Sequence, residues 1–381
     1  MTYQETLAYL SRLGRFGMKL GTQRTRAILD RLDGADRRLN GEPISEADFV
    51  QTFDRIKPVL DEVAAELGQA TEFEMLTAMA IAYLAPRVDE LVCEVGLGGR
   101  LDATNALDLG LAVITNVDLD HQKYLGNTIE EIANEKAAII KPGNRVITGC
   151  EGVALAVVEE HARRAGAEVW RLGREITLES KSQGWSGHVM SVSGPGFAYE
   201  NLELALVGDY QPANAALAVA SAHLMDRVAD DAVRRGLAAV VWPGRLQVVG
   251  RRPRVILDGG HNPAAMTKAG ASLRALIGDE RLVALFAMLS ERDPHQLFVA
   301  LRTLAPDAVV FTAATGAAGH AVDPVQLASI YGPGGEAASH PAAALARAKH
   351  LAGADGNVLV CGSLYLVGEV LAMAQQPTSQ G

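Results

Sequence analysis

The segment Glu94-Val95-Gly96-Leu97-Gly98-Gly99-Arg100-Leu101-Asp102-Ala103-Thr104-Asn105 decides the fold, because it follows an apolar run, Leu91 to Val95, that is typical of a buried strand. In parallel α/β sheets, ligands bind beyond the carboxyl ends of the strands. The glycines let the backbone approach a ligand closely, and Glu94, Arg100 and Asp102 add charges at the turn. An ordinary turn with a salt bridge is the alternative, but so dense an arrangement favours a binding loop. It is no dinucleotide fingerprint, since Gly-x-Gly-x-x-Gly would need glycine at position 101, where Leu stands.

Strands and helices alternate on the carboxyl side of this segment, which predicts a mostly parallel sheet covered by helices. On its amino side, Ser45 and Asp48 predict a capping box that opens a long helix with one apolar stripe. Residues 175–207 alternate between polar and apolar, which predicts a small antiparallel sheet. The other elements expected in this part are helices at 2–13, 23–32, 128–139, 152–165, 212–225 and 230–240, and strands at 111–115 and 145–148.

The residues Trp242-Pro243-Gly244-Arg245 indicate a linker between two domains. After it, a second alternation places strands at 255–258, 282–286, 308–311 and 358–361. The predicted fold class is therefore α/β. An N-terminal domain with a mostly parallel sheet spans residues 1–242, and a C-terminal Rossmann-like domain spans residues 246–381.

Composition excludes several classes of protein. A formal net charge of −10 without any Lys/Arg block argues against nucleic-acid binding. Cys93, Cys150 and Cys361 form neither a zinc pattern nor a disulfide framework, which favours a reducing, cytoplasmic compartment. Residues 1–17 resemble no signal peptide, and the longest apolar stretch, Leu76 to Ala85, is far too short to cross a membrane. We expect a cytoplasmic monomer without a membrane partner.

A second polar segment, Thr115-Asn116-Val117-Asp118-Leu119-Asp120-His121, also ends a predicted strand. Because carboxyl ends of parallel strands share one edge of a sheet, His121 and Glu94 are expected to meet there. A lone histidine would more often serve as a hydrogen-bonding residue, but its pairing with Glu94 favours a metal site. Mg²⁺ is the natural candidate in a phosphate site, although histidine is an unusual ligand for it.

Two more positions carry candidate side chains. Asp258-Gly259-Gly260-His261-Asn262-Pro263 joins a strand to a helix, whose N-terminus can bind a ligand. N-capping by Asn262 alone is the simpler alternative. Lys136 lies near the end of a predicted helix, where a solvated lysine is the simplest interpretation.

These segments together resemble the folylpolyglutamate synthases and dihydrofolate synthases, the folate branch of the Mur-type amide ligases. The resemblance covers nearly the whole chain, in order. Besides residues 94–105, it is carried by residues 9–17, 39–45, 119–121, 135–137, 211–214, 243–245, 258–263 and 361–363. It implies a Mur-ligase-like N-terminal domain and a C-terminal glutamate-ligase domain. The implied reaction is ATP-dependent ligation of L-glutamate to a folate or dihydropteroate through an acyl phosphate.

The resemblance also implies a ligand for each candidate residue. Mg²⁺ would be bound by Glu94, His121 and Lys136, and Lys136 would be the lysine that family members carbamylate. ATP would be contacted by Asn214, Arg245 and Asp258, with His261 near the reacting phosphate. The residues that border the pterin-carrying substrate would be Met18, Lys19, Leu20, Ala70, Thr71, Glu72, Phe73, Leu101, Asp102 and Ala103.

The chain departs from the family pattern at one place. Family members carry a βαβ unit with a Gly-Lys-Ser/Thr phosphate-binding loop, and this unit is absent between Arg37 and Arg38. No Gly-Lys dipeptide occurs anywhere in the sequence, and the serine that would complete the magnesium site is missing too. Three interpretations follow: an active ligase given with an incomplete sequence, a deletion variant without activity, or a non-catalytic folate-binding or interaction protein.

Overall fold

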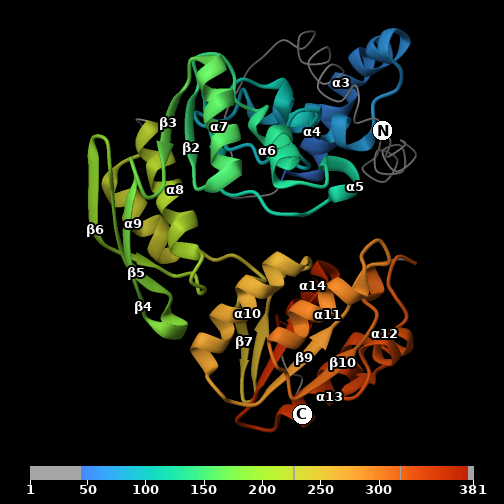
Figure 1. Ribbon diagram of the computed structural model, residues 1–381. Helices are drawn as coiled ribbons and strands as arrows, with labels where there is room; N and C mark the ends of the chain where they lie inside the picture. The colour runs from blue at the N-terminus through green and yellow to red at the C-terminus, as the bar shows by residue number, and fades with distance from the viewer. Residues whose placement is uncertain (1–43, 226–227, 318, 376–381) are drawn as a thin grey trace. The chain divides into compact units, whose positions relative to one another are not determined.

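The computed structural model describes residues 44–225, 228–317 and 319–375. The chain divides into two compact units, one of residues 1–175 and 224–226 and one of residues 176–223 and 227–381 (Figure 1). The helices predicted at 2–13 and 23–32, the site residues Met18, Lys19 and Leu20, and the junction of Arg37 with Arg38 lie outside the described residues. None of the described helices is long and apolar enough to cross a lipid bilayer.

Two packed helices open the described part of the first unit, α3 (Glu46–Leu67) and α4 (Glu72–Leu84). The predicted start of α3 is confirmed, since the Ser45 hydroxyl accepts a hydrogen bond from the Asp48 backbone N–H at 3.1 Å. The predicted apolar stripe forms the contact between the helices, with Phe53 and Ile56 fully buried.

A three-stranded parallel sheet forms the rest of the first unit, in the order β1 (Leu111–Ile114), β2 (Arg145–Thr148) and β3 (Glu168–Arg171). Helices α6 (Ile129–Ala137) and α7 (Gly152–Ala165) pack their small apolar residues on it. The short helix α5 (Gln122–Leu125) precedes α6, and a 3₁₀ turn, η2 (Ala103–Ala106), precedes β1. The parallel sheet and these two long helices agree with the prediction.

The strand predicted at Leu91 to Val95 is wrong. These residues belong to no strand, and Val92 is 87% exposed. A strand exists only where a neighbour accepts and donates its ladder hydrogen bonds. Among the strands of the described residues, β1 pairs with β2 alone, so neither β1 nor β2 supplies a neighbour for this run. Its apolar side chains are therefore not sufficient to make it a strand.

The second unit begins with a small antiparallel sheet, which confirms the prediction for residues 175–207. Its strands are β4 (Thr177–Ser182), β5 (His188–Gly194) and β6 (Phe197–Leu204), with the 3₁₀ turn η3 (Gly184–Ser186) at one end. Helices α8 (Gln211–Leu224) and α9 (Asp230–Ala239) follow. The guanidinium carbon of Arg254 lies 4.8 Å from the ring centroid of Trp185 in η3, so a cation–π contact joins this small sheet to the following one.

A six-stranded sheet forms the core of the second unit, in the order β11-β10-β9-β12-β8-β7. All neighbours are parallel except β7 with β8. One face packs against α10, α11 and α12, and the other packs against α13 and α14 (Figure 1). The central strands are buried on both faces, as this arrangement requires.

The bounds of these strands are β7 (Gln247–Arg251), β8 (Arg254–Leu257), β9 (Leu282–Phe286), β10 (Ala308–Phe311), β11 (Gly335–Ala337) and β12 (Asn357–Cys361). The bounds of the helices are α10 (Pro263–Ile277), α11 (Pro294–Thr303), η4 (Thr315–Ala317), α12 (Pro324–Tyr331), α13 (Pro341–Ala352) and α14 (Leu364–Gln375). All four strands predicted for this domain are present within one residue of their predicted ends.

Candidate functional site

The glycine-rich loop at residues 96–102 is fixed to the end of α6. The Arg100 backbone N–H donates to the Glu135 carbonyl oxygen at 2.8 Å, and the Arg100 Nε donates to the Glu135 carboxylate at 2.9 Å. A β-carbon on Gly99 would lie 2.6 Å from the Glu135 carbonyl oxygen and 3.1 Å from that of Lys136. Only glycine therefore allows this close approach of loop and helix.

Asp102 stabilises the same loop through hydrogen bonds to its side chain. Its buried carboxylate accepts the Leu97 N–H at 2.9 Å through one oxygen and the Thr104 N–H at 2.9 Å through the other. The second oxygen also accepts the Thr104 hydroxyl at 2.5 Å, so Asp102 caps η2. These bonds show that the carboxylate shapes the loop, in addition to any contact with a ligand.

Two residues predicted to border the substrate, Phe73 and Asp102, both lie beside Gly96. A β-carbon on Gly96 would lie 2.6 Å from Cζ of Phe73 and 3.2 Å from a carboxylate oxygen of Asp102, so the three lie together. Phe73 is 48% exposed and offers an aromatic face. Ala70, Thr71 and Ala103 are buried, Glu72 and Leu101 are half-buried, and Thr71 caps α4 through a capping box with Glu74.

The predicted magnesium ligands Glu94 and His121 are both exposed. His121 has a left-handed backbone (φ 50°) before α5, and its Nε2 lies 3.8 Å from a carboxylate oxygen of Asp120. Within the described ranges, no group of three or more His, Cys, Asp or Glu side chains is placed to hold a metal ion. Glu94 lies within the run 91–95, which belongs to no strand, so of the two strands predicted to end beside the metal only β1 is present.

Lys136 lies in the last turn of α6 and is half-buried. It is close enough to Cys150 for its charge to act on the thiol. Burial raises the pKa of Cys150, whereas the hydrogen bond with Thr148 and the Lys136 charge oppose that rise. Lys136 is thus less solvated than the simplest interpretation of the sequence suggested.

In the second unit, Asp258 lies at the carboxyl end of β8 and is 3% exposed. Its two oxygens accept the Leu246 N–H at 3.1 Å and the Gly260 N–H at 2.8 Å. Burial raises the pKa of this carboxyl, while the two backbone hydrogen bonds and the nearby Arg245 charge counteract the rise. The Gly259 N–H donates to the Gly244 carbonyl oxygen at 2.7 Å and so ties the linker to the strand end.

The residues His261, Asn262 and Asn214 make the following hydrogen bonds in the second unit. The His261 Nδ1–H donates to the Gly259 carbonyl oxygen at 2.8 Å. Asn262 caps α10 by accepting the Ala265 N–H at 2.8 Å, so the simpler N-capping interpretation holds for this residue. The exposed Asn214 lies in the first turn of α8, where its side-chain amide contacts Gln211 at 3.3 Å.

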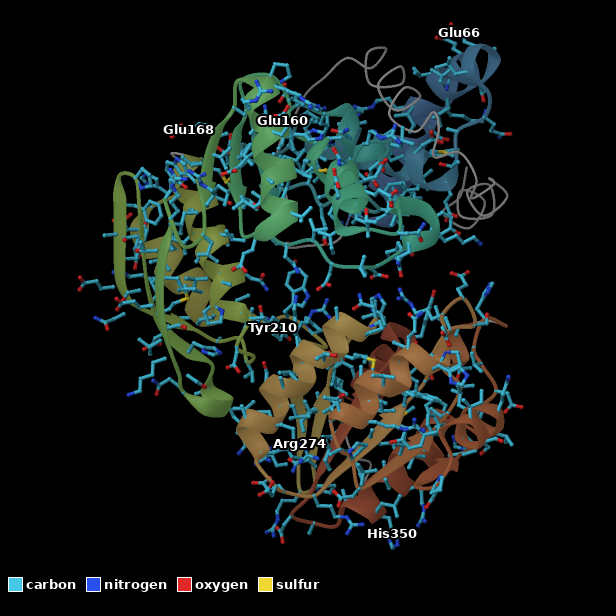
Figure 2. All side chains as sticks on the ribbon, viewed as in Figure 1. Glu66, Glu160, Glu168, Tyr210, Arg274 and His350 are labelled. Atoms are coloured by element: carbon cyan, nitrogen blue, oxygen red, sulfur yellow. The ribbon has the colours of Figure 1, made fainter. Side chains whose placement is uncertain are left out.

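Sequence reasoning assigned no role to three polar residues in the second unit. Tyr210, half-buried before α8, has its pKa raised to about 12 by burial and by the charge of Asp258, with Arg245 opposing (Figure 2). Thr312 and Ser363 follow the carboxyl ends of β10 and β12, and their hydroxyl oxygens are buried without a hydrogen-bond partner in the described structure. No periodicity marks such residues, because their burial depends on packing between distant segments.

Comparison with known proteins gives two domain matches. The Mur ligase middle domain matches residues 55–222, and the glutamate ligase domain of Mur ligases matches residues 244–364. The dihydrofolate synthase/folylpolyglutamate synthase of Escherichia coli is 32% identical over 348 residues, which cover 90% of this chain and 78% of that protein. That of Bacillus subtilis is 35% identical over 276 residues, and the match spans 64% of its length, slightly under two thirds.

Solved structures agree with these matches. Folylpolyglutamate synthase of Mycobacterium tuberculosis, complexed with ADP and AMPPCP, aligns with a TM-score of 0.82 at 30% identity, over 95% of this chain and 89% of that one. The E. coli FolC structure in complex with DHPP and ADP aligns with a TM-score of 0.82 at 27% identity, over 98% and 97% of the two chains.

Proposed function

The chain belongs to the folylpolyglutamate synthase and dihydrofolate synthase family of Mur ligases, and from this premise we propose that its chemistry is ATP-dependent ligation of L-glutamate to a folate or dihydropteroate. One observation on this chain itself supports the proposal, in addition to family membership. Asp258 is a buried carboxylate held by two backbone N–H groups beside Arg245, at the carboxyl edge of a parallel sheet. Ligands bind at this edge in α/β folds, and relatives are solved with ADP bound.

The proposed reaction has two steps. A carboxylate oxygen of the folate attacks the γ-phosphorus of ATP, ADP leaves, and an acyl phosphate forms. The glutamate amine then attacks the acyl carbon, loses a proton, and expels phosphate. Asn214, Arg245 and Asp258 hold the nucleoside end, and His261 lies near the reacting phosphate. Positioning and charge neutralisation supply most of the catalysis in phosphoryl transfer.

The proposed Mg²⁺ site uses Glu94 and His121. Both side chains are exposed, which fits a cation that keeps several waters and takes its other ligands from phosphate oxygens. When bound, Mg²⁺ neutralises charge on the transferring phosphoryl group. Lys136, half-buried at the end of α6, joins the proposed set as a carbamate, which replaces its positive charge with a carboxylate-like group.

The glutamate is proposed to bind at the same edge of the second sheet. Ser363 has a buried, unpartnered hydroxyl directly before α14. The N-terminus of a helix attracts a carboxylate through its free backbone N–H groups. A glutamate carboxylate therefore matches both the hydroxyl and the helix end.

A second candidate function is a non-catalytic folate-binding protein, and the missing Gly-Lys loop favours it. Such a loop binds the β- and γ-phosphates through backbone N–H groups and one lysine. Hydrogen bonds to charged groups contribute about 1.5–3 kcal/mol each. The loss of roughly three or four of them costs about 5 kcal/mol or more, which corresponds to a several-thousand-fold loss of affinity for the triphosphate.

Isothermal titration of the full chain with ATP and, separately, with a folate tests the proposal. We expect folate to bind, and ATP to bind weakly through its nucleoside end. The Asp258→Ala variant should lose ATP binding and keep folate binding. Binding of folate without any binding of ATP would establish the second candidate instead. Equal ATP affinity in the wild type and in Asp258→Ala would remove Asp258 from the nucleotide site.

A further inference from the structure

Tyr210 lies in a tight turn directly before α8, where Figure 2 labels it. The Gln211 N–H donates to the Gly208 carbonyl oxygen at 2.9 Å and closes this turn. Gly208 has a φ of +118°, and a β-carbon there would lie 3.0 Å from Cε1 and 3.1 Å from Cζ of Tyr210. The phenol ring is therefore folded back over Gly208, and its position is set by the backbone.

The surroundings of the ring are charged. Asp258 and Arg245 both act on the Tyr210 hydroxyl, the first raising its pKa and the second lowering it, after the larger effect of burial. With a pKa of about 12 the phenol keeps its proton at neutral pH and remains a hydrogen-bond donor. It donates to no residue in the described part of the chain. Asp258 is occupied by the Leu246 and Gly260 N–H groups but keeps lone pairs for a further donor.

We propose that Tyr210 is a further nucleotide-binding residue, whose hydroxyl donates a hydrogen bond to a sugar hydroxyl of the bound nucleotide. This inference rests on the proposed function, because it needs a nucleotide beside Asp258. A sugar hydroxyl can accept from the phenol and donate to the carboxylate at the same time. A phosphate oxygen can only accept and carries a negative charge, so Asp258 would repel it.

The experiment is isothermal titration of the full chain with ADP, 2′-deoxy-ADP and 3′-deoxy-ADP. Three proteins are compared: the wild type, Tyr210→Phe and the control Tyr199→Phe. Tyr199 is another tyrosine of the second unit and is buried, but its hydroxyl donates to Asp230 at 2.7 Å. Tyr210→Phe removes one oxygen atom and keeps the ring over Gly208, so the fold should persist, which circular dichroism checks.

We expect Tyr210→Phe to bind ADP about five- to tenfold more weakly than the wild type, the effect of one neutral hydrogen bond, while Tyr199→Phe binds ADP like the wild type. For one of the deoxy nucleotides, the wild type and Tyr210→Phe should bind equally, because that ligand lacks the hydroxyl that Tyr210 contacts. Unchanged ADP affinity in Tyr210→Phe, or an equal loss for all three nucleotides, would overturn the inference while leaving the proposed function in place. Wild-type protein that binds no ADP would overturn the proposed function and the inference with it.

A second measurement needs no variant. The wild type should bind one of the two deoxy nucleotides at least fivefold more weakly than ADP. Equal affinity of the wild type for all three nucleotides would show that no sugar hydroxyl is contacted, and the inference would then be wrong.

Discussion

At the scale of single residues, Arg171 joins the end of β3 to α7 in the first unit. The Arg171 guanidinium donates to both carboxylate oxygens of Glu175, at 2.8 Å and 2.5 Å, and also contacts Glu159. The hydrogen bonds from Arg171 lower the pKa of Glu175 to about 2, against an opposing effect of burial. Glu160 on α7 has a pKa lowered to the same value by Arg163, but its side chain is more exposed, at 39% against 22% for Glu175. Because solvent screens the more exposed ion pair more strongly, Glu175 should contribute more to stability than Glu160.

We predict that Glu175 makes the stability of the first unit depend on pH. Because its folded pKa is about 2 and its ordinary value is 4.5, its contribution is complete above pH 4.5 and is lost as the pH falls toward 2. Glu175→Gln should lower the free energy of unfolding at pH 7 by about 1–3 kcal/mol and flatten its slope between pH 4.5 and 2. Urea unfolding at several pH values measures both effects. The control Glu160→Gln should behave like the wild type, and equal behaviour of the two variants would contradict the prediction.

At the scale of elements, the contact between the glycine-rich loop and α6 places Arg100 and Lys136 relative to each other. The contact is made by backbone atoms, since Gly99 lies against the carbonyl oxygens of Glu135 and Lys136. Side chains can move away from an added methyl group, whereas carbonyl oxygens of a helix move only if the helix bends. The loop and the helix therefore behave as one rigid piece.

We predict that Gly99→Ala lowers the free energy of unfolding by about 1–3 kcal/mol, because the new β-carbon would lie 2.6 Å from the Glu135 carbonyl oxygen. The matched control is Gly236→Ala in α9, where a β-carbon meets no atom within 4 Å. That substitution should raise stability by about 0.4–1 kcal/mol, since alanine loses less backbone freedom on folding. Urea denaturation distinguishes the opposite signs, and a shift of the same sign in both variants would refute the account of this contact.

At the scale of the whole molecule, one missing unit bears on two properties. The βαβ unit would supply the phosphate-binding loop needed for activity and also strands that can pair with residues 91–95. We predict that inserting a relative's βαβ unit between Arg37 and Arg38 raises the ATP consumption that depends on folate and glutamate far above that of the unmodified chain. The unit also brings strands that can pair with this run, so its amide hydrogens should become protected from exchange. Turnover in the restored protein should require bicarbonate and should be lost in Lys136→Ala, if Lys136 is carbamylated.

The unmodified chain is the control for this insertion. Comparable turnover in both proteins would show that the loop is dispensable. Restored turnover without protection of residues 91–95 would separate catalysis from the pairing of this segment. Full activity of Lys136→Ala in the restored protein would exclude the carbamate.

The sequence by itself determined the elements whose signals are local. The cap at Ser45 and the strands at 145–148 and 282–286 follow from side-chain chemistry and periodicity within a few residues, and the structure has them at those positions. The order of motifs along the chain was likewise sufficient to identify the family. Only the tertiary structure decided whether the apolar run at 91–95 is a strand, because its hydrogen bonds need a neighbour from another part of the chain. It also decided that the charge of Asp258 acts on Tyr210, 48 positions away in the sequence, since no local pattern records which distant side chains lie near one another.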